Sequence, residues 1–271
     1  MQILAYSMKR INGHTLKVIA CVTMLIDHIT AGIMLPVVRA GLYPDSVSFD
    51  KIVLIYDILR RIGRNSFPIF CFLLVEGFIH TKSRLRYALS LLIFGLISEP
   101  FFDATFYAKQ EVFNINLKDC LIANKDILSE HCNVYFTLLI GLLVIWGADW
   151  CLSLFYKKSI PQWITFTMAV ACLGAGIYVA NFLHTDYHGY GVGMIFAFFI
   201  FRSLPPINLI VAYCAIASIS ESEFWAFPCF ILLCFYNHQR GRKLGNLKYA
   251  FYLFYPLHIF LIYVARCLIY G

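Results

Sequence analysis

Charged residues are scarce in this sequence. Only 14% of its 271 residues are Asp, Glu, Lys or Arg, whereas 61% are apolar and 25 are Phe. A soluble domain carries about 25% charged residues, so this composition excludes a water-soluble globular protein. Most of the protein surface must therefore face lipid.

The sequence also lacks the patterns of metal-binding and nucleic-acid-binding proteins. Its ten cysteines include no pair at metal-ligand spacing, although Cys120 and Cys132, in one polar segment, could form a disulfide. His184, Asp186 and His188 are spaced like metal ligands but have no further ligand nearby, so we expect no metal. The basic residues form no patch with interleaved aromatic residues, so we expect no nucleic acid partner.

Apolar runs long enough to cross a bilayer follow one another along the chain. Each crossing helix needs about 20 residues, and the runs leave little room for a soluble domain. We therefore predict an all-α, polytopic transmembrane helical bundle of about nine spans, forming a single domain over residues 1–271. The predicted spans are 16–38, 66–81, 86–104, 134–156, 159–183, 189–203, 206–220, 223–237 and 248–269.

The segments between the spans predict the orientation. Basic residues are more numerous on the side that holds the N-terminus, which places that end in the cytoplasm of a bacterial inner or plasma membrane. Residues 51–65 have isoleucines at helical spacing and charges elsewhere, which indicates an amphipathic helix at the interface or folded into the protein. The polar segment 105–133 is expected outside, as a loop or lid.

Lys17 and His28 form the first candidate site. They are eleven residues apart, which places them about 20° from the same helix face and about 16 Å apart along the axis. Cys21 and Met24 lie on the same stripe. A cation at the mouth and an imidazole at mid-bilayer suit an extended ligand with an anionic head and a reactive end. Snorkelling of the lysine and a helix–helix hydrogen bond of the histidine would explain them equally.

Three carboxylates, Asp27, Glu99 and Asp103, form a second group of candidates. Asp27 points about 100° away from its neighbour His28, so we expect it to pair with a cation such as Arg64 or Arg61, as a structural or acceptor-facing pair. Glu99 and Asp103 are one helical turn apart and could hold a cationic acceptor or a neighbouring arginine.

Two further histidines could support His28. His258 lies ten residues beyond Lys248, at a similar depth to His28, and Pro256 would kink its helix. Glu76 and His80 share a helix face and could relay protons, although such a pair could also simply neutralise itself.

Six motifs follow one another along the span-forming chain: LKVIACVTMLIDHI (16–29), RIGRNSFPIFCFLLVEGFIHT (61–81), LLIFGLISEPFFD (91–103), NVYFTLLIGLL (133–143), DYHGYGVGMI (186–195) and FYLFYPLHI (251–259). In these motifs the chain resembles the TraX family of membrane acetyltransferases, which is named for a protein that acetylates the N-terminus of conjugative pilin. The resemblance implies a membrane acyltransferase that uses acyl-CoA, with a basic residue and a histidine eleven positions later serving the coenzyme. Lys17 and His28 match that spacing, but the first position is usually Arg in the family.

We therefore expect acetyl or short acyl transfer from cytosolic acetyl-CoA to an amine, less readily a hydroxyl, which could be a peptide N-terminus, an amino sugar or a small amine. His28, His258 and Glu76 are the expected catalytic group and Lys17, Cys21 and Met24 the expected coenzyme site. Asp27, Arg64, Glu99 and Asp103 are the expected acceptor site. Direct transfer and an acetyl-histidine intermediate both remain open, as does a homo-oligomer.

Two other functional classes would use similar residues. A proton-coupled small-molecule transporter also needs buried His, Asp and Glu groups, although internal halves are not detectable in this chain. A non-catalytic membrane scaffold would only pair these groups across helices. Binding of the coenzyme would distinguish the enzyme from both.

Overall fold

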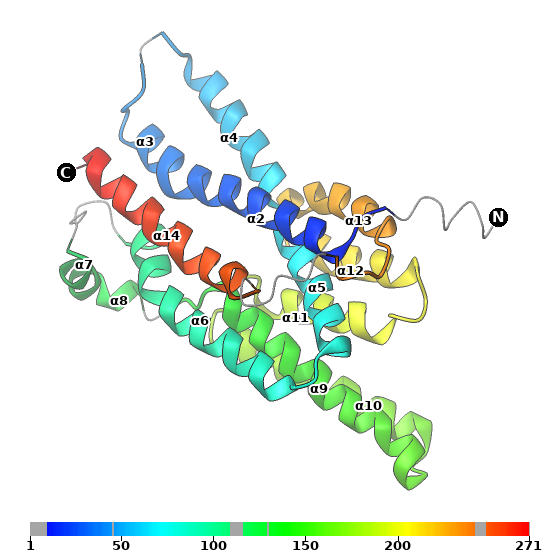
Figure 1. The fold of residues 1–271 in the computed structure, drawn as a ribbon. Helices are drawn as coiled ribbons and strands as arrows, with labels where there is room; N and C mark the ends of the chain where they lie inside the picture. The colour runs from blue at the N-terminus through cyan, green and yellow to red at the C-terminus, as the bar shows by residue number, and fades with distance from the viewer. Residues whose placement is uncertain (1–9, 45, 109–115, 129, 242–247, 271) are drawn as a thin grey trace. The chain divides into compact units, whose positions relative to one another are not determined.

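The computed structural model describes residues 10–44, 46–108, 116–128, 130–241 and 248–270. Within these ranges the chain is helical, with isolated bridges and no β-strand, as Figure 1 shows. Six helices in the described ranges are long and apolar enough to cross a membrane, which confirms the all-α polytopic bundle. They are Gly13–Arg39, Phe49–His80, Arg84–Phe106, Val134–Lys158, Gln162–Phe182 and Ala250–Ile269.

Between 188 and 237 the helices are shorter than the predicted spans. The first two are α11 (His188–Ile200) and α12 (Ile207–Ala217). The predicted span 223–237 is wrong as a single helix, because it divides into the 3-10 helix η3 (Glu221–Ala226) and α13 (Phe227–Cys234). Eight residues of α-helix reach only about 12 Å, too short to cross a bilayer.

The chain forms two compact units. The first consists of residues 1–70, 96–130 and 220–271, and the second of 71–95 and 131–219. Helices α5 (Ser66–His80) and α6 (Arg84–Phe106) contribute to both. The other helices of the first unit are α2 (Gly13–Ile29), η1 (Thr30–Met34), α3 (Leu35–Arg39), α4 (Phe49–Gly63), α7 (Leu117–Ala123), α8 (Lys125–Leu128), η3, α13 and α14 (Lys248–Tyr270). The second unit adds α9 (Val134–Lys158), α10 (Gln162–Phe182), α11 and α12.

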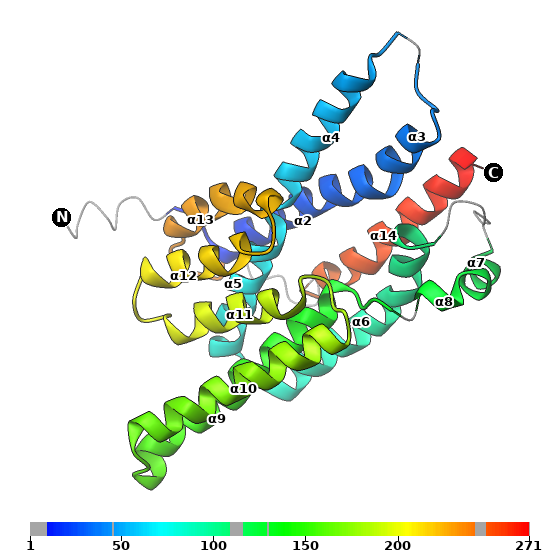
Figure 2. The ribbon, with the colours of Figure 1, turned by 180° about the vertical axis from the view of Figure 1, so that it is seen from behind.

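Glycines bring the helices of the second unit close together. A Cβ on Gly176 of α10 would overlap Val144 of α9, and a Cβ on Gly141 of α9 would overlap Ile195 of α11. Small residues at helix crossings are the usual way in which membrane helices pack, because lipid tails remove the hydrophobic drive between helices. Figure 2 shows α10 lying along α9.

Helices α2 and α14 lie together in the first unit and run in the same direction. The Lys17 ammonium lies over the Phe251 ring, 5.6 Å from its centroid, and eleven residues later His28 meets His258. The buried residues of α14, from Tyr255 through Ile262 to Cys267, recur at helical spacing and form the face that packs inside the unit.

The amphipathic helix α4 is confirmed as a helix, and most of its apolar residues face outward, although Ile52 is buried. Ile55 and Ile58 are 49% and 45% exposed, whereas Arg60 reaches Asp27 on α2. Since lipid surrounds a membrane protein, the apolar face of such a helix is stable outside, and its charges are stable when paired inside. Arg60 of α4 therefore points towards α2, where it meets Asp27 next to His28.

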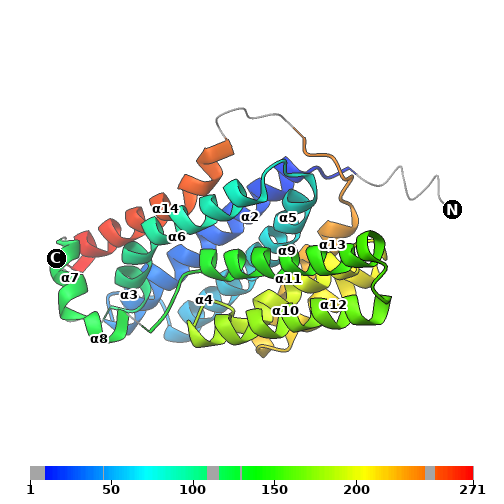
Figure 3. The same ribbon diagram turned by 90° about the horizontal axis from the view of Figure 1, so that it is seen from below.

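The predicted outer loop 105–133 contains α7 and α8, and its residues 109–115 and 129 lie outside the described ranges. Cys120 of α7 is fully buried against Tyr263 and Cys267, beside the C-terminal end of α14 (Figure 3). Burial raises the pKa of the Cys120 thiol. All ten cysteines are outside disulfides, so the bridge considered between Cys120 and Cys132 is not formed.

Candidate functional site

His28 and His258 meet between α2 and α14. The Nδ1 atom of His28 lies 2.7 Å from the Nε2 atom of His258, and the two rings stack at 16° with their centroids 4.9 Å apart. His258 is 4% exposed and His28 is half-buried. The prediction that these two histidines lie at a similar depth is therefore confirmed.

A second hydrogen bond decides which nitrogen carries each hydrogen. The Nδ1 atom of His258 lies 2.7 Å from the carbonyl oxygen of Phe254, and a carbonyl can only accept. Nδ1 of a neutral His258 therefore carries the hydrogen, and its Nε2 accepts one from Nδ1 of His28. A neutral His28 is then bare at Nε2, which has no hydrogen-bond partner within the described residues. An imidazole held this way is prepared to take a proton at Nε2.

Aromatic rings enclose the histidine pair. Phe106 of α6 and Tyr255 of α14 meet the His28 ring edge-on at 5.2 and 5.7 Å between centroids. Phe254 stacks on His258, with centroids 4.8 Å apart. Such rings exclude water and hold both imidazoles in one orientation.

The helix turn after His28 is irregular. Residues 30–34 form the π-helical turn η1, and single π turns inside α-helices are frequent at functional sites. Gly32 in this turn allows close packing, because a Cβ there would lie 2.6 Å from Cγ2 of Ile262 and 3.1 Å from Cγ2 of Thr105. The turn therefore brings α2, α6 and α14 together beside His28.

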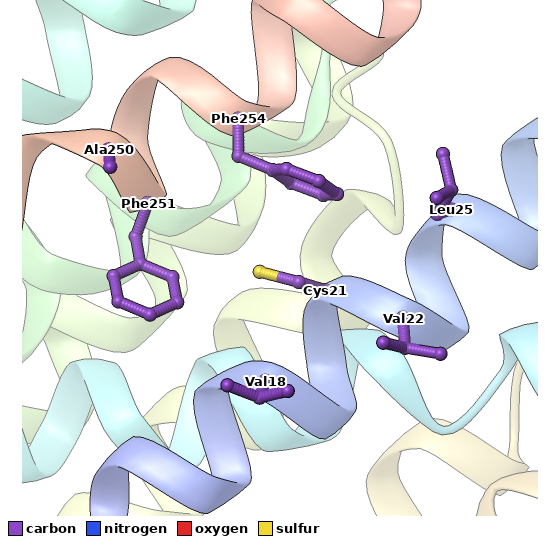
Figure 4. A pocket seen from close by; sticks show the side chains of 7 residues that line it. All are labelled: Val18, Cys21, Val22, Leu25, Ala250, Phe251 and Phe254. Atoms are coloured by element: carbon purple, nitrogen blue, oxygen red, sulfur yellow. The ribbon is translucent and has the colours of Figure 1, made fainter.

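An apolar groove of about 280 Å³ lies between α2 and α14 (Figure 4). Cys21 points from α2 towards α14, and Phe251 and Phe254 face it from the other helix. The lining residues are Val18, Cys21, Val22, Leu25, Ala250, Phe251 and Phe254. Val18 and Val22 are about half exposed, so one side of the groove opens on the protein surface.

The groove lies beside the predicted stripe and shares only Cys21 with it. Met24 is buried and does not line the groove. Residues 18, 22 and 25 point about 80–140° away from Lys17 around the helix. Sequence spacing alone does not say which of these faces packs against α14. Lys17 and His28 lie beyond the two ends of the groove. Lys17 contacts the lining residue Phe251, and His28 contacts His258, which stacks on the lining residue Phe254.

The partner of Asp27 differs from the prediction. The cation 2.7 Å from Asp27 is Arg60, whereas Arg64 lies 2.9 Å from Glu223 of η3. Arg61 lies over the Trp225 ring at 4.3 Å. Glu223 went unrecognised because its segment was interpreted as part of a span, although two acidic residues in ESEFW argued against that.

Asp103 has a buried carboxylate oxygen without a hydrogen-bond partner among the described residues. Asp103 is 6% exposed and lies one turn before Phe106, which contacts His28. Glu99, one turn earlier on α6, is close enough to repel it. The structure therefore places the predicted acceptor carboxylate Asp103 in the same unit as His28.

The remaining candidates lie in the second unit. The Nδ1 atom of His80 donates to the main-chain carbonyl of Glu76 at 2.8 Å. This hydrogen bond does not involve the Glu76 carboxylate, which a side-chain proton relay would use. His131 joins His184 and His188, with successive ring centroids 6.4 Å apart. Within the described residues no group of three His, Cys, Asp or Glu side chains is placed to hold a metal ion.

Comparison with known proteins places this arrangement in a family. The family model described as "TraX protein" matches residues 12–266, which include both histidines and the groove. The chain is also 30% identical over 269 residues to the "Probable fimbrial assembly protein FimC, serogroup H1" of Dichelobacter nodosus, covering 93% of this chain and 94% of that protein. No solved structure matches. This chain belongs to the TraX protein family.

Proposed function

We propose that this protein is a membrane acetyltransferase that moves an acetyl or short acyl group from cytosolic acyl-CoA to an amine. The observation that carries the proposal is the pair of 2.7 Å hydrogen bonds that runs from His28 through His258 to the Phe254 carbonyl. These two linked hydrogen bonds resemble those of the base and its orienting partner in acyl-transfer enzymes, where a second group fixes the tautomer of the catalytic histidine.

In the proposed reaction His28 is the catalytic base and His258 is a positioning residue. Acetyl-CoA supplies a thioester whose C–S bond breaks as the amine nitrogen bonds to the carbonyl carbon. Nε2 of His28 removes the proton from the attacking nitrogen and returns it to the departing sulfur, so the products are an amide and the CoA thiol. His258 accepts the Nδ1 hydrogen throughout and spreads the positive charge that His28 carries between the two steps.

The groove and Lys17 fit the two ends of the donor. CoA carries phosphates on one end of a long pantetheine arm and the thioester on the other. Lys17 would contact the phosphates, and Cys21 with the two Phe rings would line the arm as it passes towards His28. Lys17 lies near the N-terminal end of α2 and His28 lies near its C-terminal end. A cytosolic N-terminus would therefore put the phosphates in the cytosol and the acceptor towards the other side of the membrane.

Asp103 and Glu99 are proposed to receive the acceptor as a cation before it loses a proton. Asp103 has a buried oxygen without a hydrogen-bond partner among the described residues, and it lies one turn before Phe106, which contacts His28. That oxygen would stabilise an ammonium group. Since the similar protein from D. nodosus is named for fimbrial assembly, the terminal amine of a surface-fibre subunit is the first acceptor to test.

Coenzyme binding tests the proposal against its rivals. Purified protein should be stabilised against heat by acetyl-CoA more than by adenine nucleotides, and membranes given radiolabelled acetyl-CoA should transfer the label to an amine. Transport of a labelled solute without acyl transfer would instead support a proton-coupled transporter. A protein that neither binds the coenzyme nor moves a solute would support a scaffold.

A further inference from the structure

Arg240 is held beside the start of α2 by main-chain hydrogen bonds. The segment that follows α13 runs along residues 11–13: Asn237 donates to the Ile11 carbonyl at 2.9 Å, and Gly13 donates to the Gln239 carbonyl at 2.8 Å. An isolated parallel bridge also joins Ile11 to Tyr236. These bonds fix a segment far away in the sequence against the N-terminal end of α2, one turn before Lys17.

The contact places Arg240 on the face of α2 that carries Lys17. A Cβ on Gly13 would lie 3.5 Å from the Arg240 carbonyl oxygen and 3.7 Å from its Cα. Lys17 follows Gly13 by four residues, and residues four apart in an α-helix lie on the same face. The guanidinium of Arg240 is close enough to Lys17 to repel it.

The next residue explains why this segment is shaped in this way. Gly241 has φ of +77°, a conformation that side chains disfavour, and a Cβ there would lie 2.5 Å from Oδ1 of Asn12. Asn12 caps α2 by accepting from the Thr15 amide at 3.0 Å. Gly241 therefore lets the chain turn tightly over the helix cap, directly after Arg240.

Among the residues that the structure describes, no carboxylate pairs with either of these two cations. Neither Lys17 nor Arg240 forms an ion pair within the described ranges of the chain, and the nearby ring Phe251 offers only its face. Like charges that face one another cost free energy unless an anion is bound between them. His14, the residue after Gly13 on α2, has a buried Nδ1 atom without a hydrogen-bond partner among the described residues.

We infer that Arg240 is a second phosphate-binding residue for the acyl donor and acts together with Lys17. This inference rests on the proposed function. The planar guanidinium of an arginine binds phosphate through two parallel hydrogen bonds, whereas a lysine acts as a point charge. Arg240 adds such a two-pronged donor beside Lys17 from a different part of the chain.

The inference is tested by measuring the dissociation constant of CoA for the full-length protein in nanodiscs of phosphatidylcholine. Arg240→Ala should weaken CoA binding about 10- to 100-fold, since a hydrogen bond to a charged group is lost, and Arg240→Lys should recover part of it. Arg39→Ala removes an exposed arginine from the other end of the span that carries Lys17, and it should leave the dissociation constant of CoA unchanged. An unchanged melting temperature of ligand-free Arg240→Ala would show that the loss is one of binding.

The alternative outcomes are distinct. If the wild-type protein does not bind CoA, the proposed function fails and the inference fails with it. If the wild type binds CoA and Arg240→Ala binds it equally well, only the inference is overturned. If Arg240→Ala keeps its CoA affinity but loses preferential association with phosphatidylglycerol, Arg240 serves a lipid headgroup and the inference is likewise overturned.

Discussion

Replacing His258 tests whether it orients His28. In His258→Leu the Nδ1 hydrogen of His28 loses its acceptor, and a buried donor without a partner costs about 1–3 kcal/mol. His28 can avoid that cost by moving the hydrogen to Nε2, but this removes the lone pair that takes the proton. Since each 1.36 kcal/mol changes a rate tenfold, we expect kcat to fall by about 10- to 100-fold.

A matched variant separates orientation from packing. The side-chain oxygen of His258→Gln can still accept from Nδ1 of His28, so this variant should keep a larger part of the activity than the leucine variant. The KM for acetyl-CoA should stay the same in both, because His258 lies beyond the groove that would hold the donor. Initial rates of thiol release from acetyl-CoA, measured with the purified variants, give both constants.

The double variant gives the decisive comparison. His28→Ala alone should lower kcat by about 10²- to 10⁴-fold, the range for a lost general base. Adding His258→Leu should then cost almost nothing further, because a positioning residue has no effect once the residue it positions is absent. If the two losses multiply instead, or if His258→Leu retains the wild-type kcat, the two histidines do not act as a unit.

Three further predictions concern the surroundings of the site. Gly32→Ala should lower the stability of the protein in a detergent melting assay by about 1–3 kcal/mol, because the added methyl group must displace Ile262; unchanged melting would contradict the close packing. Asp27→Asn should destabilise it by leaving Arg60 unpaired, and adding Arg60→Gln should restore part of the loss, whereas additive losses would argue against the ion pair. The raised pKa of Cys120 keeps its thiol protonated, so its alkylation at pH 8 should be much slower in folded than in SDS-unfolded protein; equal rates would contradict its burial.

The sequence patterns predicted best those features that depend on one helix at a time. The all-α fold follows from apolar runs, and the positions of Lys17 and His28 on a common face follow from helical spacing. The depth of His258 could be predicted because distance along a helix is fixed by residue number. The spacing gave no indication that the two rings meet at 2.7 Å and stack.

Features that depend on the rotation of one helix against another could not be predicted. Arg60 rather than Arg64 or Arg61 meets Asp27 because the phase of α4 relative to α2 is set by packing. The same limit explains why Leu25 lines the groove while Met24, on the predicted stripe, does not. The place of Arg240 could not be predicted either, since the bonds that bring it to α2 join segments far apart in the sequence.

The central claim is that His28 receives a proton during acetyl transfer. The most direct test measures transfer of radiolabelled acetyl groups from acetyl-CoA to a primary amine by wild-type and His28→Ala protein, with both shown to be folded by their melting temperatures. The wild type should label the amine rapidly, and the variant should lose at least about 100-fold of this activity. A folded His28→Ala protein that labels the amine at the wild-type rate would contradict it.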